Sequence, residues 1–141
     1  MSGCIFCKIV RGEVPSIKVY EDQNILAFMD IKPINPGHVL VVPKQHAELL
    51  TELEDRFVGE MLIKAKKIGL MLKKSKLNAK GVNYLLADGA DAGQEVFHAH
   101  LHVIPRYRRD GFEFRMPANY DKETDLADLE RIATKIRKAA E

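Results

Sequence analysis

The chain has 141 residues, of which 46% are hydrophobic and 30% are charged, and its formal net charge is +2. These values are typical of a globular protein with one core, and the small net charge gives no reason to expect a nucleic-acid partner. No apolar run is long enough to cross a bilayer, and the first residues lack a basic segment followed by an apolar one. We therefore expect one cytoplasmic domain over residues 1–141, with no nucleic-acid or membrane partner.

Short apolar segments predict three strands in the first third of the chain. Residues 17–20 and 25–29 are separated by four polar residues, which indicates a β-hairpin. Residues 30–37 contain two prolines and a glycine and are expected to form a loop. Residues 38–43 are almost continuously apolar, so we expect this strand to lie in the middle of a sheet that is covered on both faces.

A long amphipathic helix is predicted after residue 50. Thr51 and Glu54 have the spacing of a capping box, which would start the helix. One apolar stripe at helical spacing contains Leu53, Phe57, Met61, Ala65, Ile68 and Leu72. The lysines of this region lie mostly off the stripe and no aromatic residues alternate with them, so they indicate a solvated face rather than a nucleic-acid surface.

The second half of the chain completes an α+β pattern. Residues 82–86 and 97–105 are predicted strands, and a loop rich in small residues connects them. Residues 124–140 predict a second amphipathic helix, with acidic residues early and basic residues late. The pattern therefore indicates a five-stranded antiparallel sheet with one long helix and one C-terminal helix; residues 4–105 form the core, and residues 106–141 form the tail and C-terminal helix.

Three histidines alternate with apolar residues in the last predicted strand. On a strand, His98, His100 and His102 share one face. The opposite face, which we expect to be core, carries Phe97, Ala99, Leu101 and Val103. Imidazole attacks phosphorus well and also leaves well, so a nucleophilic site for phosphoryl chemistry fits this pattern. A zinc or copper site fits the spacing equally well.

The two cysteines have the spacing C-x-x-C in a short ordered segment over residues 5–10. Cys4 and Cys7 supply two of the four ligands that a structural zinc ion takes, and His46 and His98 are candidates for the other two. Two reduced thiols at a mobile end of the chain are the alternative interpretation.

Several motifs together resemble the histidine triad family. His98-Ala99-His100-Leu101-His102-Val103-Ile104 is similar to the signature His-φ-His-φ-His-φ-φ, in which φ is hydrophobic. The order of the other segments is also similar to that of the family's zinc-carrying bacterial and archaeal members. These segments are residues 4–10, 26–31, 36–46 and 93–98.

The resemblance implies a homodimer in which two five-stranded sheets join, and a purine nucleotide such as AMP or GMP as the ligand. It implies hydrolysis or transfer at the α-phosphate through a nucleotidyl intermediate on His100, with no metal at the phosphate. His98, His102 and His38 match the other histidines of the catalytic pocket. Among the matching nucleotide contacts, Asp30 is the acceptor for the ribose hydroxyls. The matching residues around the base are Phe6, Ile9, Phe28, Ile31 and Leu40. The matching residues at the phosphate are Gln94, His100 and His102. Cys4, Cys7, His46 and His98 match ligands of a structural zinc ion.

The chain departs from the family pattern at the residue after Gln94. Glu95 stands where a serine or threonine is common near the leaving group. An ionised carboxylate repels an anionic phosphate, whereas a protonated one donates a proton to the leaving group. Nucleoside phosphoramidates are the substrates expected first. Cleavage of dinucleoside polyphosphates and a nucleotide-binding signalling role with little turnover are the alternatives.

Overall fold

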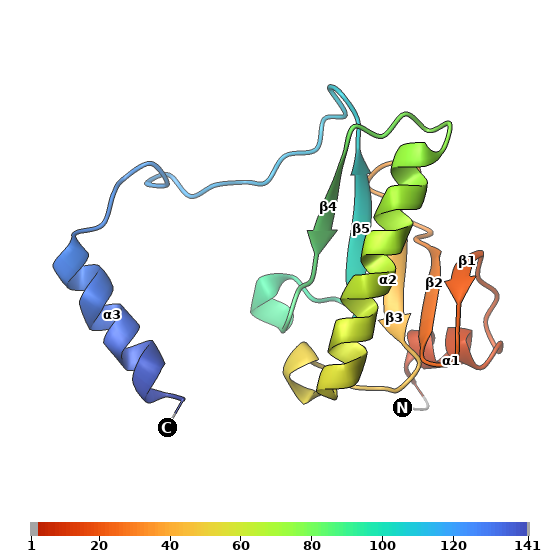
Figure 1. Ribbon diagram of the computed structural model, residues 1–141, viewed down its shortest axis with the longest axis horizontal. Helices are drawn as coiled ribbons and strands as arrows, with labels where there is room; N and C mark the ends of the chain where they lie inside the picture. The colour runs from red at the N-terminus through yellow and green to blue at the C-terminus, as the bar shows by residue number, and fades with distance from the viewer. Residues whose placement is uncertain (1–2, 141) are drawn as a thin grey trace.

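The computed structural model describes residues 3–140, so residues 1, 2 and 141 of the expected domain lie outside the described residues. Five antiparallel strands form one sheet in the order β1-β2-β3-β5-β4 (Figure 1). The strands are β1 (Lys18–Glu21), β2 (Ile25–Met29), β3 (Val39–Pro43), β4 (Gly81–Leu85) and β5 (Leu101–Arg106). The expected α+β architecture is confirmed, and β3 is the central strand, as its apolar sequence predicts.

Two helices cover opposite faces of the sheet and a third stands apart. They are α1 (Ile5–Val10), α2 (Asp55–Lys74) and α3 (Leu126–Lys138), and single turns of 3-10 helix lie at Leu50–Glu52 and Ala90–Ala92. The long helix α2 crosses one face of the sheet, whereas α1 lies at its other face near β2 and β3 (Figure 1). No helix within residues 3–140 is long and apolar enough to cross a membrane.

The main core lies between α2 and the sheet. All six residues of the predicted helical stripe are buried there, together with Ile25, Ala27, Val39, Val41, Leu101 and Val103 of the strands. Burial of one large aliphatic side chain contributes about 1.5–3 kcal/mol, so this layer supplies much of the stability of the fold. It also fixes the register of β5 and hence the direction of its alternate residues.

A smaller apolar cluster lies on the opposite face. Phe6 and Ile9 of α1 pack on Leu26 and Phe28 of β2, and on β3 through Leu40 and Val42. The Phe6 and Phe28 rings meet edge to face, with centroids 5.5 Å apart. This cluster holds α1, and with it the cysteines, against the face of the sheet that carries the histidines.

Two of the predicted boundaries are wrong by more than two residues. Thr51 lies in the 3-10 turn and not at the start of α2, whose N-cap is Glu54 without a side-chain cap. The last strand begins at Leu101, because the Ala99 N–H donates to the carbonyl of Ala47 in a loop and not to a neighbouring strand. Phe97, which was expected in the core, is 42% exposed for the same reason: it lies before the strand.

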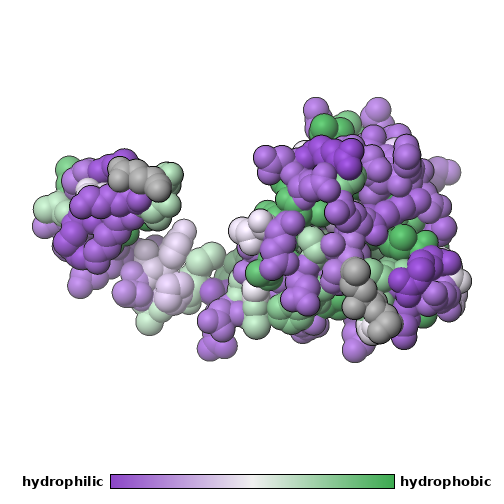
Figure 2. All heavy atoms as spheres, turned by 90° about the horizontal axis from the view of Figure 1, so that it is seen from below, coloured by the Kyte–Doolittle hydropathy of each residue, from purple (hydrophilic) through white to green (hydrophobic). Residues whose placement is uncertain are grey.

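The C-terminal helix α3 forms where it was expected but buries no side chain. The segment before it leads away from the sheet, so that α3 lies well apart from the rest of the chain (Figure 1). The space-filling view shows the same separation, with apolar atoms at the margins of the helix (Figure 2). The exposed apolar residues of α3 are Leu126, Leu129, Ile132 and Ile136.

Candidate functional site

The three histidines of the triad lie at and before the start of β5. Only His102 is inside the strand, where it pairs with Leu40 of β3 and with Leu85 of β4. The rings of His100 and His102 are adjacent, with centroids 4.9 Å apart. The Phe6 ring contacts both His98 and His100, at centroid distances of 5.9 and 5.1 Å. The imidazoles therefore gather on the α1 side of the sheet, as the alternation predicts.

His100 presents one free ring nitrogen. Its Nδ1 lies 2.7 Å from the carbonyl oxygen of His98. A carbonyl oxygen only accepts, so Nδ1 carries the proton and a neutral ring has its lone pair on Nε2. Burial lowers the pKa of His100, which favours this neutral form. Nε2 of His100 has no hydrogen-bond partner. Every buried polar side-chain atom within residues 3–140 has one, so Nε2 is not buried and reaches solvent, although the residue as a whole is only 7% exposed.

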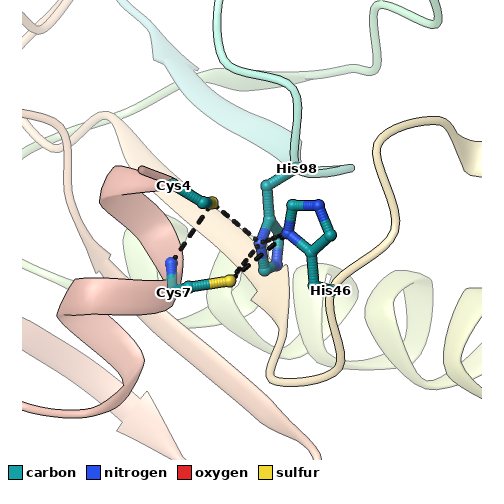
Figure 3. A group of neighbouring side chains, drawn as sticks. All are labelled: Cys4, Cys7, His46 and His98. Carbon is teal, nitrogen blue, oxygen red and sulfur yellow. Dashed lines mark hydrogen bonds between the residues drawn. The ribbon is translucent and has the colours of Figure 1, made fainter. Parts of the chain in front are cut away.

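His98 has the opposite tautomer. Its Nε2 donates to the carbonyl oxygen of Pro43 at 2.7 Å, which leaves the lone pair on Nδ1. That Nδ1 faces the cysteines of α1 and the ring of His46, which comes from the loop after β3 (Figure 3). Burial lowers the pKa of His98 to about 4, so the ring is neutral. The ring of His98 is thus turned to the cysteines, whereas the main-chain carbonyl oxygen of His98 contacts His100.

The four ligand atoms of this cluster have the dimensions of a tetrahedral metal site. Cys4 Sγ and Cys7 Sγ lie 3.4 and 3.6 Å from His98 Nδ1, and His46 Nδ1 lies 3.3 Å from Cys7 Sγ. The two Nδ1 atoms are 3.2 Å apart. A tetrahedron with zinc–ligand bonds of about 2.0–2.3 Å has edges of about 3.3–3.8 Å. Burial raises the pKa of the Cys7 thiol, and a bound cation is what would favour its thiolate. The donor set therefore fits zinc.

A second group of candidate ligands does not suit a metal ion. A carboxylate oxygen of Asp30 and ring nitrogens of His38 and His102 lie within 4.8 Å of one another. The main-chain N–H of Ile34 donates to His38 Nδ1 at 3.0 Å, so a neutral His38 carries its proton on Nε2. Ligation through Nε2 would require an imidazolate anion. This hydrogen bond therefore argues against metal binding by the triad face, the alternative that the spacing left open.

The residues expected around a nucleotide fall into two sets. Phe6, Ile9, Phe28 and Leu40 are buried in one cluster next to His100. Ile31, in contrast, is 92% exposed in the loop after β2. Asp30, at the start of that loop, accepts from the Lys32 N–H through Oδ1, and its Oδ2 lies 3.6 Å from His38 Nε2. The carboxylate retains accepting positions for further donors.

The Gln94 amide holds the loop before β5 together. Its oxygen accepts from the Gly89 N–H, and its nitrogen donates to the carbonyls of Glu48 and Val96. Both amide hydrogens are therefore engaged, so the side chain has no hydrogen free for the phosphate contact that was expected of it. Glu95 is exposed and lines a cavity of about 380 Å³ beside the cysteine cluster, together with Glu48 and Phe97.

Sequence reasoning missed the polar network that supports the loop between β2 and β3. The buried Asn35 donates to the Pro105 carbonyl and to Asp110, and Asp110 also accepts from the Arg106 guanidinium. It likewise missed the main-chain groups of Ile34 and Pro43 that fix the ring tautomers. A main-chain N–H or carbonyl has no signature in sequence, but an asparagine between two prolines could have indicated the network.

Comparisons with known proteins match the chain to one family and to several of its members. The HIT domain family matches residues 11–109. A HIT-like protein of Borreliella burgdorferi is 52% identical over 118 residues, which are 82% of this chain and 84% of that protein. A Candida albicans protein named adenosine 5'-monophosphoramidase is 36% identical over 140 residues, 96% of this chain and 90% of its own length. An Arabidopsis thaliana adenylylsulfatase is 42% identical over 109 residues, 77% of this chain and 55% of its own length.

Solved structures of similar proteins share the fold. A Streptococcus mutans protein superposes with a TM-score of 0.92 and 40% identity, covering 100% of this chain and 87% of that one. A zinc-bound histidine triad family protein from Mycobacterium smegmatis has a TM-score of 0.77 and 38% identity, covering 99% of each chain.

Proposed function

The chain belongs to the HIT domain family, and we propose that it hydrolyses purine nucleoside phosphoramidates, or transfers their nucleotidyl group, by attack of His100 at the α-phosphate. The observation that carries this proposal is the hydrogen bond from His100 Nδ1 to the His98 carbonyl, which leaves an accessible lone pair on Nε2. The name of the Candida albicans relative, a monophosphoramidase, supports the same reaction.

The reaction proceeds in two displacements. His100 Nε2 attacks phosphorus, the bond from phosphorus to the leaving nitrogen breaks, and the amine departs with a proton from solvent. Water then attacks phosphorus, and the bond to Nε2 breaks as the nucleotide leaves. The His98 carbonyl oxygen accepts from the Nδ1–H throughout, which stabilises the positive charge that the ring gains in the first step.

Binding of the nucleotide uses the two sets of residues around His100. In this proposal Phe6, Ile9, Phe28, Ile31 and Leu40 surround the base, and the Asp30 carboxylate accepts from the ribose hydroxyls. A carboxylate suits that role because it accepts two hydrogen bonds at once. Phosphate contacts come from His100 and His102, whereas Gln94 contributes indirectly by holding the loop before β5 in place.

The carboxylate of Glu95 favours an amine as the leaving group over an anion. A sulfate or a polyphosphate brings negative charge toward Glu95, whereas an amine brings none. Hydrolysis of dinucleoside polyphosphates and of adenylyl sulfate, the substrate class that the name of the Arabidopsis relative indicates, is therefore expected to be slower.

The test compares three substrates with the same adenylyl group. Steady-state kcat/KM is measured for an adenosine phosphoramidate, adenylyl sulfate and a diadenosine polyphosphate, with the chain and with Glu95→Gln. We expect the phosphoramidate to be preferred, and Glu95→Gln to reduce the preference. Nucleotide binding without turnover of any of the three would instead support the signalling role.

Zinc is proposed as the structural ion of the Cys4, Cys7, His46 and His98 cluster. The four-ligand set and its dimensions support it, and so does the zinc-bound relative from Mycobacterium smegmatis. A bound ion would tie α1 to the start of β5 and would hold His98, whose carbonyl orients His100. It takes no part in the reaction at phosphorus.

A homodimer is proposed through the edge strand β4. The other edge strand, β1, is short, carries Lys18 and Glu21, and has an irregular register, features that prevent pairing with another chain. In contrast, β4 carries no charged residue, and its Tyr84 is 43% exposed. Antiparallel pairing of two β4 strands would join the sheets of two copies into one.

A further inference from the structure

His38 is buried, and both of its ring nitrogens are hydrogen-bonded. The Ile34 N–H donates to Nδ1 at 3.0 Å, and Nε2 lies 2.9 Å from His102 Nδ1. Burial lowers the pKa of His38, and a protonated ring would place an N–H against the Ile34 N–H. His38 is therefore neutral, with its proton on Nε2, and this proton is donated to His102 Nδ1.

The proton of His102 is placed by this bond. Because His102 Nδ1 accepts from His38, a neutral His102 carries its own proton on Nε2. Nε2 of His102 has no hydrogen-bond partner. Every buried polar side-chain atom within residues 3–140 has one, so the Nε2–H of His102 is not buried and reaches solvent. The ring lies beside that of His100, with centroids 4.9 Å apart. The donor of His102 is thus exposed next to the attacking nitrogen.

We propose that His38 is a positioning residue that fixes the tautomer of His102, so that His102 directs an N–H and not a lone pair at the phosphoryl oxygens. The inference deepens the proposed function and rests on it for the identity of the ligand. The donor chain begins at the Ile34 main chain, passes through His38 and ends at His102 Nε2. The ring of His38 itself does not touch the substrate.

The neighbouring carboxylate makes this role necessary. An Asp30 oxygen lies 3.6 Å from His38 Nε2, and the ligand atoms of Asp30, His38 and His102 are all within 4.8 Å of one another. Without the donor of His38, the Asp30 carboxylate is the acceptor available to His102 Nδ1, and it favours a proton there. His102 would then present a lone pair to an anionic phosphate, which repels it.

The test reads the tautomer directly by long-range ¹H–¹⁵N correlation of the histidine rings at mildly alkaline pH. Three proteins are compared: the unmodified chain, His38→Phe, which removes the donor and keeps an aromatic ring, and His38→Gln, whose amide restores a donor near the position of Nε2. We expect a protonated Nε2 on His102 in the unmodified chain and in His38→Gln. In His38→Phe we expect a protonated Nδ1.

Kinetics provides a second readout. A donor that acts on the charge developing at the phosphoryl oxygens affects kcat more than KM, so His38→Phe should lower kcat on the order of tenfold to a hundredfold. His38→Gln should retain most of the activity, which a purely structural role in packing would not explain.

A protonated Nδ1 on His102 in the unmodified chain overturns the inference, whether or not the variants fold. An unchanged His102 tautomer in a folded His38→Phe overturns it as well. The ring spectra need no substrate, so their outcome is separate from the proposed function, whose failure is seen as absence of turnover by the unmodified chain.

Discussion

At the scale of single residues, the site depends on which ring nitrogen carries each proton. Main-chain groups decide this for three histidines: the His98 carbonyl for His100, the Pro43 carbonyl for His98 and the Ile34 N–H for His38. Each of these groups has a fixed role as donor or acceptor, so each ring has one neutral tautomer. The result is a lone pair on Nε2 of His100 and a lone pair on Nδ1 of His98 that faces the cysteines.

Replacement of one cysteine should release the proposed zinc ion. In Cys7→Ser the site loses a thiolate ligand, so we expect the zinc content, near one ion per chain in the unmodified protein, to fall and the Tm to decrease by several degrees. Elemental analysis and thermal unfolding measure the two effects.

Treatment of the unmodified chain with a strong chelator is the matched control. It should reproduce the lower Tm, and zinc should restore it. Equal zinc content and equal Tm in Cys7→Ser and the unmodified protein would mean that the cluster holds two reduced thiols and no ion.

At the scale of elements, the loop between β2 and β3 is fastened to the end of β5. Asp110 accepts from Arg106, from Asn35 and from the N–H groups of Tyr107 and Phe112. The Arg106 hydrogen bonds, followed by that of Tyr107, hold the pKa of Asp110 well below its usual range. The network thereby supports the loop that carries Asp30 and Ile34.

Loss of this carboxylate should destabilise the protein in a pH-dependent way. Because the folded pKa of Asp110 is depressed, its contribution is complete above the unfolded pKa of about 3.9 and is lost as the pH falls toward the folded value. Asp110→Asn should therefore lower the Tm at neutral pH, and the difference in Tm should shrink below about pH 4.

Asp121→Asn, on the exposed segment before α3, is the control and should change the Tm little. A difference in Tm between Asp110→Asn and the unmodified chain that stays constant from neutral to acidic pH would contradict the assigned ionisation.

The elements could be predicted from sequence where one residue pattern decides them. The period of α2 and the apolar character of β3 correspond to a buried stripe and a central strand. Features that depend on contacts between distant segments were missed. The start of β5 is set by the bond from Ala99 to Ala47, and the Gln94 amide is engaged by Glu48, Gly89 and Val96. The triad and the four candidate ligands of the cluster carry their chemistry in side chains, which is why sequence alone could point to them.

At the scale of the whole molecule, α3 is an amphipathic helix that buries no side chain against the rest of residues 3–140. Its apolar side chains, which include Leu129 and Ile132, remain exposed. The helix stands clear of the main body of the molecule (Figure 2). Helices of this length gain most of their stability from packing of an apolar face. We therefore expect a second copy of the chain to cover this face in addition to pairing at β4.

Sedimentation measures the monomer–dimer equilibrium and so tests this expectation. The unmodified chain should sediment as a dimer at micromolar concentration, and the double variant Leu129→Asp, Ile132→Asp should shift the equilibrium toward the monomer. Lys135→Ala, on the polar face of α3, is the control and should leave the dimer unchanged. A monomeric unmodified chain at the same concentration would rule out both contacts.

The central claim of the account is that His100 Nε2 forms a covalent bond to phosphorus. The most direct test is mass spectrometry of the protein mixed with an adenosine phosphoramidate and quenched with denaturant at alkaline pH, followed by peptide mapping. The account predicts an added mass of one AMP less one water, located on His100 and absent from His100→Ala. Turnover that continues in His100→Ala, or an adduct located on any other residue, would contradict it.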